Sequence, residues 1–339
     1  MSARRMRGVA EHDREPNQLL TPPGAVDHAI TDMTVTFAAD VTLAALQAQL
    51  APHAQWLPVD GAIHTRPTES WAAEDHPSLG ELVLRNSTGP LRLGFGAWRD
   101  VLLGAQFVNG RGELISVGGR VLKNVAGYDV TKLLVGSHGI FGSVVSLTAR
   151  TWRRPAGALH VEIDPRQVEM TQLIASPLRP QWAVQFGEDS MMMGYLGDEA
   201  ALEYYESRLP ALNAQRVRRR TVDDDAEQRH RLWPICMARA RVFLPPDRLD
   251  GFVARPPFWP YTADRAFGVV ISGANSEVNA DRVMQAAQTA GATAAIYSAD
   301  GMLARTSLDP VAYQLLQRLK RAFDPDDSLP ALPTNEYSA

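Results

Sequence analysis

The chain has 339 residues, of which 45% are hydrophobic and 21% charged, so it is long enough to bury the cores of two ordinary domains and is neither a disordered tail nor a mini-protein. Its 34 basic and 38 acidic side chains give a formal net charge of −4, which argues against a broad basic surface for nucleic acid. The single cysteine, Cys236, excludes an internal disulfide and every CxxC metal or iron–sulfur motif, so a reducing compartment fits best.

The first 24 residues carry basic, acidic and proline residues but no apolar core of a signal peptide. We expect residues 1–24 to be a disordered lead. Elsewhere no apolar run approaches the roughly 20 residues that a membrane-spanning helix needs. The sequence therefore predicts a protein without a membrane span.

Regular structure is predicted to begin at residue 34. Residues 34–37 are β-branched and aromatic and favour a strand, whereas leucines recur at helical spacing within residues 43–50. Residues 56–58 favour a second short strand. Residues 61–80 are rich in proline, histidine, glycine and acidic side chains, which indicates a long connection over the surface or along a site.

Closely spaced glycines dominate the next 60 residues, and the short apolar runs between them predict strands. These runs are 101–103, 105–108, 114–117 and 144–148. The dipeptide Asn109-Gly110 is typical of a hairpin turn, so residues 105–117 should form an antiparallel ribbon.

The composition changes after Pro155, where we place a domain boundary. Strands are predicted at 159–163, 182–186, 242–244, 268–271 and 294–297, and helices at 199–209 and 280–290. The resulting organisation is a first domain over 25–155, an α+β domain over 156–329, and a tail over 330–339.

Two unusual runs lie in the second domain. The arginine-rich run 216–220 precedes the acidic run 223–225, which predicts a solvated, self-paired loop or helix start rather than a nucleic-acid site. Three methionines at 191–193 are typical of core filling, with a flexible binding surface as the alternative.

Standard catalytic motifs are missing from the sequence. It contains no GxxxxGK[ST], HExxH or GxSxG motif, and no two of its eight histidines have the spacing of a metal-ligand pair on a helix. We therefore predict no metal site and name no catalytic residue.

One segment, residues 119–145, stands apart from this background. Glycines at 136, 139 and 142 leave main-chain N–H groups unobstructed, so a pyrophosphate or a flavin ring edge could approach the backbone there. Glycines at this spacing also occur where elements pack tightly, and spacing alone leaves both interpretations open.

The whole string GRVLKNVAGYDVTKLLVGSHGIFGSVV over 119–145 resembles the signature of flavoproteins with a vanillyl-alcohol-oxidase (PCMH-type) FAD-binding domain. Among these, it is most similar to the smaller, E-type subunits of bacterial glycolate oxidases. The similarity begins near residue 32 and continues through 87–100. Near the end of the chain, residues 319–325 resemble the closing helix and the FDP turn of that family.

The resemblance implies an α+β fold in which a PCMH-type FAD-binding domain is followed by an α+β cap domain. The residues that it places along non-covalently bound FAD are Ser78, Leu79, Gly80, Gly89, Gly136, Ser137, Gly139, Ile140, Gly142 and Val144. Further matches to the signature are also compatible with structural roles. They are Lys123, Asn124, Tyr128 and Asp129. His138 lies inside the glycine string, where it either faces the flavin or packs as an ordinary histidine.

The function implied by the resemblance is that of an FAD-binding subunit in a glycolate (2-hydroxyacid) oxidase or dehydrogenase complex. Its expected partners are a larger D-like flavoprotein subunit and an F-like iron–sulfur subunit that receives the electrons. The expected location is the cytoplasm, peripheral to the inner membrane through the complex. A self-sufficient oxidase is a weaker interpretation because it would need an intact FAD site.

Three departures from the family pattern support a different alternative. Residues 1–31 contain no RGGGT-like phosphate loop, so either the true start lies upstream or the domain is N-terminally shortened. Gly80 is followed by Glu81, whose carboxylate would repel a diphosphate, and Asp326 to Pro330 replace an NPG-like ending. The alternative is a non-catalytic scaffold subunit that has lost full FAD binding.

Overall fold

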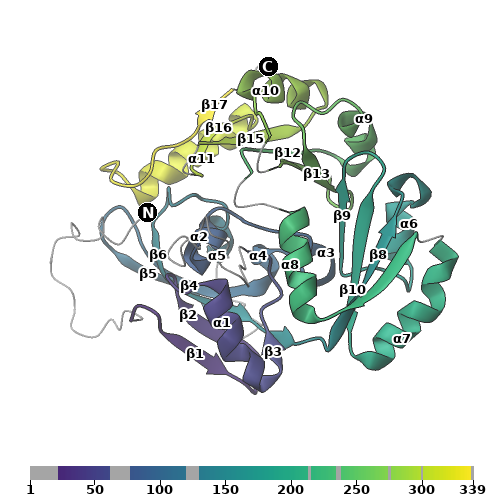
Figure 1. Ribbon diagram of the computed structural model, residues 1–339. Helices are drawn as coiled ribbons and strands as arrows, with labels where there is room; N and C mark the ends of the chain where they lie inside the picture. Colours follow the sequence, from purple (N-terminus) through teal and green to yellow (C-terminus); the bar gives the residue numbers. More distant parts are fainter. Residues whose placement is uncertain are drawn as a thin grey trace.

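Two large, mainly antiparallel sheets organise the chain in this computed structural model (Figure 1). The structure describes residues 22–61, 77–119, 130–212, 215–233, 238–273, 276–298 and 301–336. Cys236, most of the predicted lead, most of the connection 61–80, and the signature residues at 123, 124, 128 and 129 lie outside this description.

The first sheet has the strand order β1-β2-β6-β4-β5, and every neighbouring pair is antiparallel. Its strands are β1 (Val26–Ala29), β2 (Thr34–Ala38), β4 (Leu102–Val108), β5 (Leu114–Gly118) and β6 (Ser143–Arg150). Short helices accompany them: α1 (Leu43–Leu50), α2 (Leu79–Leu84), α3 (Arg92–Phe95), α4 (Trp98–Val101) and α5 (Thr131–Leu134). The buried leucines of α1 and α2 pack against Phe37 and Leu147 of the sheet and close its core.

The predictions for this half are largely confirmed. The strand at 34–37, the helix at 43–50, the hairpin over 105–117 and the strand at 144–148 are all present. The prediction of a separate strand at 101–103 was wrong, because Val101 ends α4 and one strand runs from Leu102 to Val108. Strand β1 was not predicted because it is only four residues long and half-buried.

The second sheet has ten strands in the order β11-β8-β10-β9-β13-β14-β12-β15-β16-β17. Its strands are β8 (Gly157–Ile163), β9 (Trp182–Phe186), β10 (Met191–Gly197), β11 (Arg216–Arg220), β12 (Ala240–Phe243), β13 (Tyr261–Asp264), β14 (Val269–Ser272), β15 (Thr293–Tyr297), β16 (Leu303–Thr306) and β17 (Thr334–Asn335). The helices of this part are α6 (Met170–Ala175), α7 (Glu199–Arg208), α8 (Val222–Leu232), α9 (Leu249–Val253), α10 (Ala280–Thr289) and α11 (Pro310–Phe323).

The two unusual runs of this half, the methionines and the arginines, both lie in strands of the second sheet. Met191 and Met193 are fully buried in β10, so core filling is confirmed for these two, whereas Met192 between them is half-buried. The arginine run is not a loop or a helix start: it is the edge strand β11, paired with β8. A run of arginines hides this strand because the apolar alternation that identifies strands is absent. The acidic residues that follow do start a helix, α8, capped by Thr221.

The two sheets meet through a shared apolar layer. The chain passes from one to the other between β7 (Trp152–Arg153), which pairs with β3 (Gln55–Trp56), and β8. Trp56 and Leu91 from the first half pack with Trp182 and Trp233 from the second half. The end of α11 returns to the first sheet, where the ring of Phe323 lies near Phe107 and Phe141. The junction is therefore built from both halves of the chain.

Candidate functional site

The predicted glycine site is a tight, largely buried turn between α5 and β6. Gly136, His138 and Gly139 have φ angles of 78°, 51° and 80°, in the left-handed region that favours glycine. The turn packs on α2, because Gly136 N donates to Val83 O at 3.0 Å and His138 N donates to Leu84 O at 2.8 Å. The glycines therefore let the turn approach a neighbouring helix.

The second predicted group begins at α2. Ser78 caps this helix: its hydroxyl accepts from Glu81 N, and the Glu81 carboxylate accepts from Ser78 N at 3.0 Å. The carboxylate of Glu81 thus serves the helix start as a capping box. Gly80 is needed because a Cβ there would lie 2.9 Å from Ala39 Cβ.

Most of the main-chain donors expected to meet FAD are already engaged within the chain. Hydrogen bonds inside the chain use the N–H groups of Ser78, Leu79, Gly80, Gly136, Ser137, Ile140 and Gly142. A diphosphate needs such donors free and aimed at it. In the described part of the chain these residues, as placed here, do not fit the diphosphate of FAD. Their assignment to FAD stays a prediction that requires the turn to rearrange.

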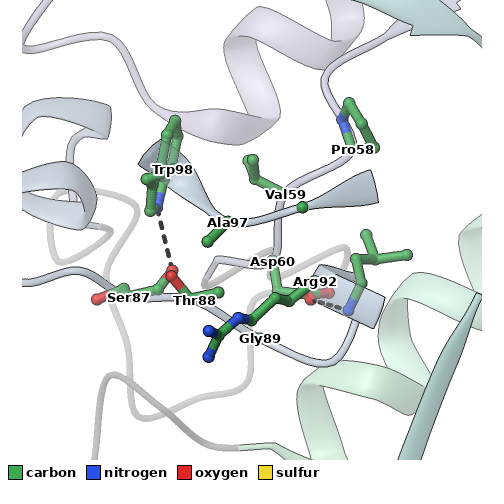
Figure 2. Close-up of a pocket in the computed structure, with 11 residues that line it drawn as sticks. Pro58, Val59, Asp60, Ser87, Thr88, Gly89, Arg92, Ala97 and Trp98 are labelled. Carbon is green, nitrogen blue, oxygen red and sulfur yellow. Dashed lines mark hydrogen bonds between the residues drawn. The ribbon is translucent and has the colours of Figure 1, made fainter. Parts of the chain in front are cut away.

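Gly89 lies beside Asp60 and close to α3 and α4 (Figure 2). A Cβ on Gly89 would lie 2.3 Å from Asp60 Cβ, so the glycine makes room for this carboxylate. Asp60 Oδ2 accepts from Leu91 N at 2.8 Å, and Trp98 Nε1 donates to Ser87 O at 3.1 Å. The cavity among them measures about 10 Å³, close to the minimum for one water molecule.

Behind Gly89 three charged side chains, Asp60, Arg229 and Asp225, form a buried ionic chain that joins the two halves of the protein. Arg229 of α8 donates through Nε to Asp60 Oδ1 at 2.8 Å and also pairs with Asp225 one turn earlier. Asp225 is fully buried, and its Oδ1 lies 2.9 Å from both His160 Nε2 and Trp182 Nε1. The carboxylates of Asp60 and Asp225 thus each have a cationic and a hydrogen-bonding partner, as buried charges require.

His138 packs at the same junction, farther along the second sheet. Its ring lies 5.8 Å from that of Tyr297, over which the guanidinium of Arg241 also lies, at 4.6 Å. Burial, with the nearby charges of Arg241 and Arg85, lowers the pKa of His138 to about 4. The ring is therefore neutral at pH 7, and the packed interpretation of this histidine is supported.

This low pKa predicts a stability that depends on pH. Between about pH 6.5 and 4 the unfolded chain binds a proton at His138 that the folded chain does not, so stability falls as the pH falls through that window. From pH 7 to pH 5 the expected contribution of His138 to the loss of unfolding free energy is roughly 2 kcal/mol.

Urea unfolding of the wild type and of His138→Asn at both pH values would measure this effect. Asparagine tolerates the left-handed backbone of this position, so the variant should fold and lose less stability at pH 5. An equal loss in both proteins would contradict the prediction.

The chain is similar in sequence to subunits of bacterial glycolate oxidases. No protein-family profile matches it. It is 25% identical over 309 residues to glycolate oxidase subunit GlcE of Escherichia coli, covering 89% of this chain and 82% of that subunit. It is 33% identical over 108 residues to subunit GlcD of Bacillus subtilis, covering 30% of this chain but only 23% of GlcD. The resemblance to E-type subunits predicted from the sequence is confirmed.

A solved structure shows the fold. An alkyldihydroxyacetonephosphate synthase superposes on 91% of this chain with a TM-score of 0.58 at 13% identity, and the chain spans 65% of the synthase's length. The vanillyl-alcohol-oxidase (PCMH-type) fold is thus the fold of this chain. No helix in the described ranges is long and apolar enough to cross a membrane.

Sequence reasoning missed the buried ionic chain altogether. The pair Asp225 and Arg229, four residues apart on a helix with few apolar residues, reads as an ordinary solvated pair. Asp60 lies 169 residues away from Arg229, and no local pattern links them. The one available signal was a tryptophan in a buried strand, Trp182, whose N–H needs a partner.

Proposed function

We propose that this chain is a subunit of an FAD-dependent oxidoreductase complex that oxidises glycolate or a related 2-hydroxyacid. The observation that carries the proposal is the similarity to GlcE along 89% of the chain. A shorter similarity to a D-2-hydroxyglutarate dehydrogenase of Xanthomonas citri, 30% identical over 125 residues, agrees with the same substrate class.

The complex would contain a larger D-like flavoprotein subunit and an F-like iron–sulfur subunit. The two-electron oxidation of the substrate carbinol would reduce flavin in the complex, and the F-like subunit would take the electrons. The proposed location is the cytoplasm, peripheral to the inner membrane through the complex. Within the chain we propose an FAD-type domain over 25–155 and a cap domain over 156–329.

One observation favours a second candidate, a scaffold subunit that has lost full FAD binding. Most of the N–H donors of the predicted cofactor residues are bonded inside the chain, and the cavity beside Gly89 holds about 10 Å³. Each charged hydrogen bond that a diphosphate fails to make forfeits roughly 1.5–3 kcal/mol. Two such losses weaken binding by about 100-fold or more.

Flavin stoichiometry separates the two candidates. The full chain is purified alone and after co-expression with D-like and F-like subunits, and the flavin absorbance per chain is measured together with glycolate and D-lactate oxidation. We expect substoichiometric flavin in the isolated chain, and activity only in the complex. Full FAD occupancy in a monomer that oxidises glycolate unaided would contradict an accessory role, and no association with either subunit would refute the proposed complex.

A further inference from the structure

A second cavity lies between the edge strand β11, the neighbouring strands β8 and β10, and helix α8. It measures about 190 Å³ and is lined by His160, Glu162, Met192, Arg216, Arg218, Arg220 and Gln228. Alternate residues of a strand share a face, so the three arginines of β11 point to the same side of the sheet as the β8 residues that they oppose. Arg216 opposes Glu162, Arg218 opposes His160, and Arg220 opposes Ala158. The cavity is therefore bounded by three guanidinium groups in a row.

The positive charge of this row is only partly compensated. Arg216 pairs loosely with Glu162, at 3.7 Å, and the exposed carboxylate of Asp224 acts on Arg220 from the start of α8. In the described part of the chain, Arg218 and Arg220 form no salt bridge. His160 adds no charge at neutral pH, since burial and nearby arginines lower its pKa to about 4.

The opposite face of the same strand shows the contrast. Arg219, which points the other way, is held by two glutamates of α7, Glu199 and Glu206, the latter at 2.8 Å. The fold thus supplies carboxylates for the arginine outside the cavity but leaves the central arginine inside it without one. Three like charges about 7 Å apart along a strand repel one another, and an anion between them would relieve that repulsion.

We propose that this cavity binds a small anion with at least two negative charges, either a phosphate group or a dicarboxylate. Planar guanidinium groups match the oxygen pairs of both ligands, and Gln228 adds an amide that can donate. A volume of about 190 Å³ lies below the roughly 300–1,000 Å³ of pockets for drug-sized ligands. The size therefore favours a compact anion over a nucleotide.

The site is separate from the predicted FAD residues, none of which lines it. It nevertheless touches the buried ionic chain, because the His160 ring that lines the cavity lies 2.9 Å from Asp225. Because no predicted FAD residue lines the cavity, anion binding there is a property beyond the proposed function and does not depend on flavin.

Calorimetric titration of the full chain tests the proposal. Inorganic phosphate and malonate are titrated at low, matched ionic strength, with acetate and chloride as monovalent comparisons, because screening weakens exposed charge interactions. We expect saturable binding of phosphate or malonate at one site per chain, and at least roughly tenfold weaker binding of the monovalent ions. Heats that never saturate with either divalent ion would overturn the proposal.

Three variants place the site. Arg218→Gln should weaken binding roughly tenfold or more, and Arg218→Lys should weaken it less because the charge stays while the paired donors are lost. Arg282→Gln, which replaces another exposed arginine, on α10, should bind as the wild type does. Both positions are exposed, so the variants should stay folded, which thermal unfolding checks. Binding that survives Arg218→Gln, or that Arg282→Gln weakens equally, would overturn the assignment to this cavity.

Discussion

Replacing Arg229 with methionine is expected to lower the free energy of unfolding by about 3–5 kcal/mol, the usual loss when one partner of a buried ion pair is removed. Arg229 is buried between Asp60 of the first half and Asp225 of the second. Without its guanidinium, both carboxylates lose their cation, and Asp225 has no access to water. Methionine fills a similar volume, so the loss reports charge rather than a cavity. Urea unfolding at pH 7 measures it.

The chain offers a matched control on the same helix. Arg231 pairs with Glu227 four residues earlier, as Arg229 pairs with Asp225, but its side chain is 67% exposed. Arg231→Met should change stability by about 0.5 kcal/mol or less. Adding Asp60→Asn and Asp225→Asn to Arg229→Met should restore part of the loss, because no buried charge is then left unpaired. Equal effects of Arg229→Met and Arg231→Met on the free energy of unfolding would show that the buried ionic chain is no more important for stability than an exposed ion pair.

Local patterns explain why much of the fold was predictable. The strand at 34–38 and the helix at 43–50 each carry a period that a single element imposes on its own sequence. The hairpin over 105–117 follows from two adjacent turn residues. Strand β11 could not be predicted in this way, because four of its five residues are arginines. Only its pairing with β8, which is a tertiary contact, identifies it as a strand.

The candidate site was harder to predict because its glycines have two compatible explanations. Glycine lets a ligand approach the backbone, and it equally lets another backbone approach. At Gly80 and Gly142 the structure shows the second case: Cβ atoms there would lie 2.9 Å from Ala39 Cβ and 2.6 Å from Val108 O. Which partner a glycine serves depends on contacts between distant segments, which spacing along the chain does not encode.

Gly89→Ala is expected to destabilise the chain even without flavin, by about 2–4 kcal/mol, which combines overpacking with the disturbance of a buried ion pair. The new Cβ would lie 2.3 Å from Asp60 Cβ and 2.4 Å from Asp60 Oδ2, so the Asp60 side chain must move. That movement pulls its oxygens from Leu91 N and from Arg229, both now at 2.8 Å. Thermal and urea unfolding of flavin-free protein measure the loss.

Gly251→Ala is the matched control, because outside its own helical turn and chain neighbours no atom lies within 4 Å of the added Cβ, and alanine favours the helix α9 in which it stands. It should leave the free energy of unfolding unchanged or raise it slightly. Comparing the stabilities of Gly89→Ala and Gly251→Ala distinguishes two roles for Gly89, which are making room for Asp60 and admitting flavin to the backbone. If its role were to admit flavin to the backbone, Gly89→Ala would leave the flavin-free chain as stable as the wild type and abolish only flavin binding. A loss of stability confined to Gly89→Ala would instead show that this glycine makes room for Asp60, which holds the two halves of the protein together through Arg229.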